Sequence, residues 1–333
     1  MAMKRGQKLG ISDDSEYLSD DSDFYGDETV KRELERRATS FSPAEWWGRK
    51  ILSPTEMANL SIKSASLSQT ATLYNPYEGQ RCGRQLGETV DEFLQRLPPS
   101  TTMKETAIPW IFISNPFRKA PRSQVEYSQY WLANEGPPDE ESDWAQFVRV
   151  GEKLLEELTS IKHAIEKKRA GQSKATIAKA VNVEKEVIVQ KLLDKAVELH
   201  CTSGKWMMFY ESSAVDAVWS IIAHATASNE LGIAAKVAPD EGDRRGPRLI
   251  CIYTKDFTDM EDVTRVISKM RDLGLINVKG KPIYYKCDAY TYLNIKSGNE
   301  YNIKASLYNS ADVLNPKDTG LKSQRLDGSF YKR

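Results

Sequence analysis

The sequence predicts a sheet protein of the α/β or α+β class, in which helices connect the strands of the C-terminal third. Apolar runs rich in β-branched and aromatic residues at 204–211, 232–238 and 248–254 have the length and composition of strands. Residues 213–227 and 259–273 carry apolar side chains three and four positions apart, as amphipathic helices do. Strands joined by helices favour a sheet with helices packed against it.

Two elements are predicted in the N-terminal half. Residues 88–97 place apolar side chains at helical spacing, with Thr89 as the N-cap and Pro98-Pro99 as the stop. Residues 109–115 (PWIFISN) form an apolar, β-branched and aromatic run, which suits a buried strand.

A helical hairpin is predicted over residues 143–199. Apolar residues recur at three- and four-residue steps over 143–169 and again over 174–199, and a Gly-Gln-Ser break at 171–173 separates the two helices. The hairpin is expected to pack on the rest of the protein. A coiled-coil dimer is the alternative, although fewer than four clean heptads run without interruption.

The C-terminal elements include one helix with clear ends and one aromatic segment. Asp259 is placed to cap the helix that ends near Gly274. Residues 282–295 (PIYYKCDAYTYLNI) are predicted to form a long aromatic strand or hairpin.

The charge distribution divides the chain into three parts. Lys and Arg total 47 in 333 residues, as do Asp and Glu, but residues 13–28 hold eight acids and no base. We therefore expect a disordered acidic tail over 1–38, a single domain over 39–312 that includes the hairpin, and a basic flexible tail over 313–333.

Several functional classes find no support in the sequence. No apolar run is long enough for a transmembrane helix, and no secretory signal is visible at the N-terminus. The four cysteines are widely spaced and accompany only three histidines, so we expect reduced thiols, no metal site and a cytoplasmic or nuclear location, or both. Nucleotide-loop, metalloprotease and hydrolase motifs are absent, so we expect no enzyme and no cofactor.

Lysines and tyrosines on the predicted strands form the candidate ligand site. Period-two alternation places Tyr284 and Lys286 on one strand face, and Tyr253 with Lys255 on one face of another. Such a face can stack a base and pair with its phosphates, or it can be structural, with tyrosines filling a half-buried sheet and lysines in solvent. The candidate ligand-binding residues are Lys205, Lys236, Tyr253, Lys255, Tyr284 and Lys286.

The same segments resemble a known family. GKWMMFYE, LGIAAKVAP, RLICIYTKDFTDMEDVTRVISKMRDLGL and IYYKCDAYTYLNI, together with ETVDEFLQRLPPSTT and PWIFISNP, are similar to the basophilic leukaemia-expressed protein family of uncharacterised eukaryotic proteins. The resemblance implies an α+β fold similar to the cap-binding translation initiation factor 4E, with a curved antiparallel sheet and helices on its convex face. The hairpin would be an insertion into that fold.

The resemblance does not carry the cap-binding site with it. Cap-binding factors hold a methylated guanine between two loop tryptophans, and no such pair can be placed in this sequence. Trp46, Trp47 and Trp110 match in residue type only, whereas Trp206 and Trp219 are predicted core residues.

The first functional hypothesis is therefore a non-enzymatic protein that binds RNA or a nucleotide on the concave sheet face. The alternative is a protein-interaction adaptor that uses the hairpin or the convex helices, with a structural sheet. An unrecognised nucleotide-processing enzyme is a third. Because residues 201–312 contain 14 bases and 14 acids, any nucleic-acid site there should be small and local.

Overall fold

The computed structural model describes residues 28–44, 73–119, 136, 141–242, 246–277 and 280–315, and the chain divides into two units, Met1–Gln69 and Thr70–Arg333. In the first unit, helix α1 (Glu28–Ser40) has no buried residue. Residues 28–38 of the predicted acidic tail are thus helical. The rest of that tail, Trp46, Trp47 and residues 316–333 lie outside the described residues.

The second unit contains a six-stranded sheet, so the α+β class is confirmed. Its order is β1-β3-β4-β2-β5-β6, and every pair of neighbouring strands is antiparallel. The strands are β1 (Ile111–Ser114), β2 (Gly204–Tyr210), β3 (Ala234–Val237), β4 (Arg248–Thr254), β5 (Tyr284–Cys287) and β6 (Tyr308–Asn309).

Side-chain caps fix the starts of most of the longer helices. Thr89 and Glu92 form a reciprocal capping box, and Asp143, Ser173 and Asp259 each accept a hydrogen bond from the first turn that follows them. The predicted caps at Thr89 and Asp259 are therefore confirmed. The helices are α4 (Val90–Arg96), α5 (Trp144–Lys168), α6 (Lys174–Glu198), α7 (Ser212–Ala227), α8 (Met260–Asp272), α9 (Asp288–Tyr292) and α10 (Ser310–Leu314).

The prediction of a long strand or hairpin over 282–295 was wrong beyond Cys287. Strand β5 ends there, and the chain turns into the short helix α9. The backbone N–H of Asp288 donates to the carbonyl of Ser203, and its carboxylate accepts from the Ser203 hydroxyl at 2.7 Å. These tertiary contacts favour the turn over the strand propensity of the aromatic residues.

One face of the sheet packs against helices α7 and α8. Trp206 lies on this face with its ladder partners, Ile252 and Tyr285. All three belong to the main core, as do Trp219 of α7 and Val263 of α8. The indole N–H of Trp206 donates to the carbonyl of Val263 at 3.3 Å. The predicted core positions of Trp206 and Trp219 are confirmed, since neither side chain is exposed.

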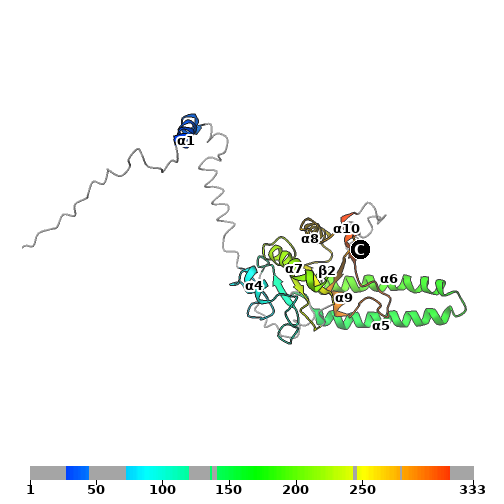
Figure 1. Cartoon of the computed structure of the whole chain (residues 1–333). Coiled ribbons are helices and arrows are strands. Elements are labelled where there is room, and N and C mark those ends of the chain that lie inside the picture. The colour runs from blue at the N-terminus through cyan, green and yellow to red at the C-terminus, as the bar shows by residue number, and fades with distance from the viewer. Residues whose placement is uncertain are drawn as a thin grey trace, which may run out of the picture. The chain divides into compact units, whose positions relative to one another are not determined.

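Helices α5 and α6 form the predicted hairpin and run side by side (Figure 1). The start of α5 packs on α9, where the rings of Phe147 and Tyr292 meet edge to face at 6.4 Å between centroids. A Cβ on Gly151 would lie 2.6 Å from a methyl carbon of Leu293, so glycine permits this close approach.

Candidate functional site

The predicted ligand residues gather on the sheet face opposite to α7 and α8, which we call the lysine face. Lys205 of β2 lies between Tyr253 of β4 and Lys286 of β5 in the ladder. Tyr284 is the partner of Met207, and Met207 is also the partner of Cys251. Lys236 of β3 is the partner of Cys251 from the other side, so the antiparallel register brings five of the six candidate residues to one face. These five are Lys205, Lys236, Tyr253, Tyr284 and Lys286.

Lys255 is the candidate that the ladder does not place with the others. It is exposed and lies one residue beyond the end of β4, where its carbonyl accepts a hydrogen bond from the Thr202 hydroxyl at 3.3 Å. Lys255 therefore lies at the end of the sheet, beyond the last ladder pair of β4.

Lys205 forms the most buried ion pair of the lysine face. Its ammonium contacts the Asp288 carboxylate, and these side chains are 6% and 0% exposed, respectively. The hydroxyl of Thr291 accepts a second hydrogen bond from Lys205 at 3.2 Å. Because Asp288 compensates the charge of Lys205, this lysine contributes little net attraction for an anion.

Lys236 is also buried, and it lies among aromatic rings. Its Nζ is 4.1 Å from the ring centroid of Trp110, 5.8 Å from that of Tyr253 and 5.9 Å from that of Phe112. Cation–π attraction of this kind stabilises a desolvated ammonium. Lys236 is 2% exposed and Tyr253 is not exposed at all, so this part of the face is closed to solvent.

Gly136 contributes to this closure. A Cβ at Gly136 would lie 2.5 Å from an oxygen of Asp288 and 2.9 Å from the ring of Tyr253. The backbone at Gly136 thus packs directly against the buried part of the lysine face, where a larger residue would not fit without rearrangement.

The β5 end of the lysine face is open to solvent. Tyr284 is 46% exposed, and Phe209 of β2, on the same face as Lys205 and Met207, is 64% exposed. Phe209 lies two residues beyond the ladder partner of Tyr284, which makes the two rings diagonal neighbours, with Cα atoms roughly 7–8 Å apart. Lys286 is partly exposed two residues from Tyr284 on the same face of β5, and burial and the nearby Lys205 lower its pKa.

The buried thiols of the sheet are poorly suited to nucleophilic chemistry. Burial raises the pKa of Cys251, and it raises that of Cys287 to about 12. Both thiols are therefore protonated at neutral pH, whereas reactive cysteines carry a lowered pKa. All four cysteines are buried thiols outside any disulfide.

Two kinds of feature are absent from the described residues. They contain no group of three His, Cys, Asp or Glu side chains arranged to hold a metal ion. Within the same part of the chain, no helix combines the length and the apolar character that crossing a membrane requires.

The sequence interpretation did not single out several residues of this face. Phe209 could have been found by continuing the alternation from Lys205, because the run GKWMMFYE places both on one side. Trp110 lies immediately before β1 and contacts Lys236 of β3, which is far away in the sequence, so no local signal marks this contact. The pairing of Asp288 with Lys205 depends on the turn into α9, which the sequence interpretation missed.

Most of the chain matches a model of a known protein family. The family model described as basophilic leukemia-expressed protein Bles03 matches residues 34–294, which include the hairpin and the first five strands of the sheet.

Proposed function

The chain belongs to the basophilic leukemia-expressed protein Bles03 family, and from this premise we propose that it is a non-enzymatic binding protein whose ligand site is the lysine face. The ligand would carry a planar base and a phosphate, as RNA and nucleotides do. One observation carries the proposal: exposed Tyr284 has Phe209 as its diagonal neighbour on β2 and Lys286 two residues along β5, all on one face of the sheet.

The contacts of the ligand are proposed for the open end of this face. Tyr284 and Phe209 would stack against a base, and Lys286 would meet the phosphate. Lys205, Lys236 and Tyr253 would support the site from below, since their own contacts keep them out of solvent. Lys255 would add positive charge at the end of the sheet.

A likeness to initiation factor 4E is part of the same proposal. It is supported by an antiparallel sheet with α7 and α8 packed on one face and the lysine face on the other. Reduced, buried cysteines support a cytoplasmic or nuclear location, or both.

The proposal is tested by fluorescence anisotropy with a labelled single-stranded RNA of about 10 nucleotides at low salt. Tyr284→Ala should weaken binding by about 1–3 kcal/mol, the usual contribution of one stacked base, whereas Tyr284→Phe should retain it. Lys286→Ala should weaken binding and flatten its salt dependence. Lys269→Ala is the matched control, because it removes a partly exposed lysine from α8, which packs on the opposite face of the sheet.

Competition by a mononucleotide would identify a nucleotide site, whereas resistance to it would identify a polymer site. Absence of RNA and nucleotide binding at low salt, or equal effects of Lys286→Ala and Lys269→Ala, would refute the lysine face as the site.

A protein-interaction adaptor is the second candidate function, and the hairpin favours it. A cavity lies between its helices on a part of the hairpin that the core does not cover.

A further inference from the structure

The outer part of the hairpin consists of half-buried and exposed residues. We call residues 159–187 the distal hairpin; none of them is buried. The buried residues of α5 and α6 all lie closer to the sheet: Phe147, Gly151, Leu155, Leu158, Ile188, Leu192, Leu193 and Ala196. Two capped helices thus continue beyond the core that stabilises them, although helix pairs in water usually depend on such packing.

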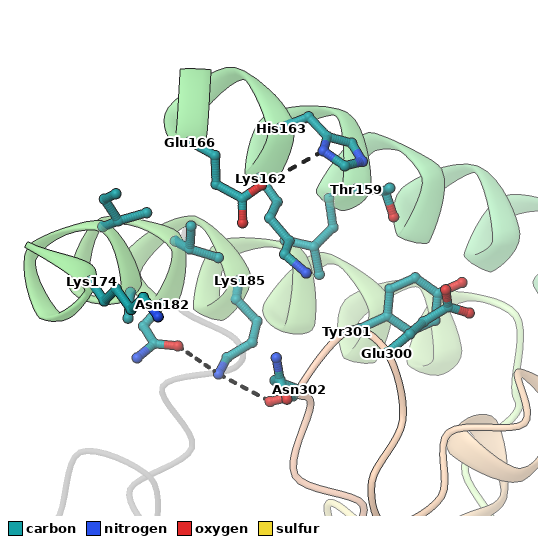
Figure 2. Close-up of a pocket in the computed structure, with 14 residues that line it drawn as sticks. Thr159, Lys162, His163, Glu166, Lys174, Asn182, Lys185, Glu300, Tyr301 and Asn302 are labelled. Atoms are coloured by element: carbon teal, nitrogen blue, oxygen red, sulfur yellow. Dashed lines mark hydrogen bonds and ion pairs between the residues drawn. The ribbon is translucent and has the colours of Figure 1, made fainter. Parts of the chain in front are cut away.

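The distal hairpin contains a cavity of about 550 Å³ between the two helices. Aliphatic side chains of Leu158, Ile177 and Val181 line it, and the loop at Tyr301 and Asn302 closes one side. Figure 2 shows Lys162 extending from α5 into the space between the helices. A volume of this size lies in the range of binding pockets in proteins.

The closing loop is fixed to α6. The ammonium of Lys185 donates to the Asn182 side-chain oxygen at 2.9 Å and to the carbonyl of Asn302 at 3.1 Å (Figure 2). The cavity therefore has one wall that is held in place before any ligand arrives, which lowers the entropic cost of binding.

The charge around this cavity is mainly positive. The distal hairpin contains seven Lys and Arg residues and three acids. Lys162 and Lys174 line the cavity, and so do Glu166 and Glu300. Glu166 lies 3.7 Å from His163, so its carboxylate is directed toward a neighbour on its own helix (Figure 2).

We propose that the distal hairpin is the docking site for an acidic amphipathic segment of a partner protein. Aliphatic or aromatic side chains of that segment would enter the cavity, and its carboxylates would meet Lys162 and Lys174. Charge complementarity and the aliphatic lining together favour this occupant. A nucleic acid would use the positive charge but little of the lining, because Tyr301 is the only Phe, Tyr or Trp among the residues that line the cavity and residues 159–187 contain none.

The site is tested on the full-length chain with a fluorescein-labelled probe peptide of about five helical turns. Its Leu residues lie three and four positions apart, so that they form one face of a helix, and Glu residues form the opposite face. Fluorescence anisotropy should report saturable binding. Lys162→Glu/Lys174→Glu should weaken it at least about tenfold. Lys153→Glu/Lys179→Glu makes the same change in charge on exposed residues outside the cavity lining, and should change affinity only about twofold.

A second pair of variants tests the lining. Ile177→Gln places an amide in the cavity and should weaken peptide binding. Val183→Gln alters an exposed valine of the same helix outside the cavity and should leave peptide binding unchanged. Circular dichroism melts identify any variant that has lost the hairpin. Lys286→Ala should leave peptide binding unchanged, so this result is independent of the lysine face.

Three outcomes would overturn the proposal. The first is no binding of the peptide. The second is equal loss in the two double charge variants, which would indicate general attraction by the basic tip. The third is that a single-stranded RNA binds in place of the peptide and that both double charge variants weaken RNA binding equally. That result would assign the distal hairpin to phosphate polymers.

Discussion

The ion pair between Lys205 and Asp288 has consequences for stability at the level of single residues. Both side chains are almost fully removed from water, and the carboxylate also accepts from Ser203. Desolvation offsets much of the attraction in such a pair, so the pair itself adds little. Removing one partner is different, because the other charge stays buried.

We therefore expect Asp288→Asn to destabilise the fold by about 3–5 kcal/mol, measured by urea unfolding at neutral pH. Glu157→Gln is the matched control. It breaks the exposed pair with Lys191, whose charged atoms are 3.1 Å apart, and should cost about 1 kcal/mol or less. Equal losses in the two variants would contradict the structural role of the buried pair.

Single residues also show where sequence reasoning was sufficient for the site. Alternation alone placed Tyr284 and Lys286 on one face, and the ladder register has the same arrangement. Burial was not predictable, because it depends on Gly136, Trp110 and the partner of Lys205. These contacts join segments that are distant in the sequence, and no local pattern encodes them.

At the level of elements, the approach of β3 to β4 depends on a residue without a side chain. Gly232 immediately precedes Ile233, whose N–H donates to the carbonyl of Tyr253 at 2.9 Å. A Cβ on Gly232 would lie 1.8 Å from that same carbonyl oxygen. Backbone cannot move aside as a flexible side chain can, so the strand itself would have to shift.

Gly232→Ala should accordingly reduce the free energy of unfolding by about 1–3 kcal/mol, as overpacking does. Hydrogen exchange should show faster exchange in β3 than in β2. Gly87→Ala provides the comparison, since nothing lies within 4 Å of its Cβ position, and it should change stability by less than about 0.5 kcal/mol. If Gly232→Ala were as stable as Gly87→Ala, the close approach would have no energetic importance.

The elements also show which secondary structure the sequence could predict. Helices α4, α5 and α8 have caps and apolar spacing that are visible in the sequence, and all three were predicted close to their bounds. Helix α9 was missed because its aromatic residues favour strands, while the contacts that turn the chain at Asp288 come from β2 and the residue before it.

At the level of the whole molecule, the hairpin divides into a part that belongs to the core and a part that does not. The boundary lies after Leu158 in α5 and before Ile188 in α6. The distal hairpin should therefore be dispensable for folding.

Replacing residues 162–178 by a short Gly-Ser turn should change the unfolding free energy by less than about 1 kcal/mol, because no buried apolar residue is removed. The same variant should no longer bind the probe peptide, and it should retain any RNA binding by the lysine face. Calorimetry and the two anisotropy assays measure these three quantities. A large loss of stability, or retention of peptide binding, would show that this division of the hairpin is wrong.

The position of the hairpin in the chain also affects the order in which the protein acquires its structure during synthesis. Strand β1 leaves the ribosome before α5 and α6, but its ladder partner β3 follows β2 and α7. Contacts within the hairpin are local, and those of β1 with β3 span the intervening hairpin, so the hairpin can form long before the sheet closes. Ile111, Phe112 and Ile113 of β1 remain without their partners until Ala235, Lys236 and Val237 have been translated. During that interval the apolar side chains of β1 are exposed to aggregation, a risk that ends only when β3 completes the ladder.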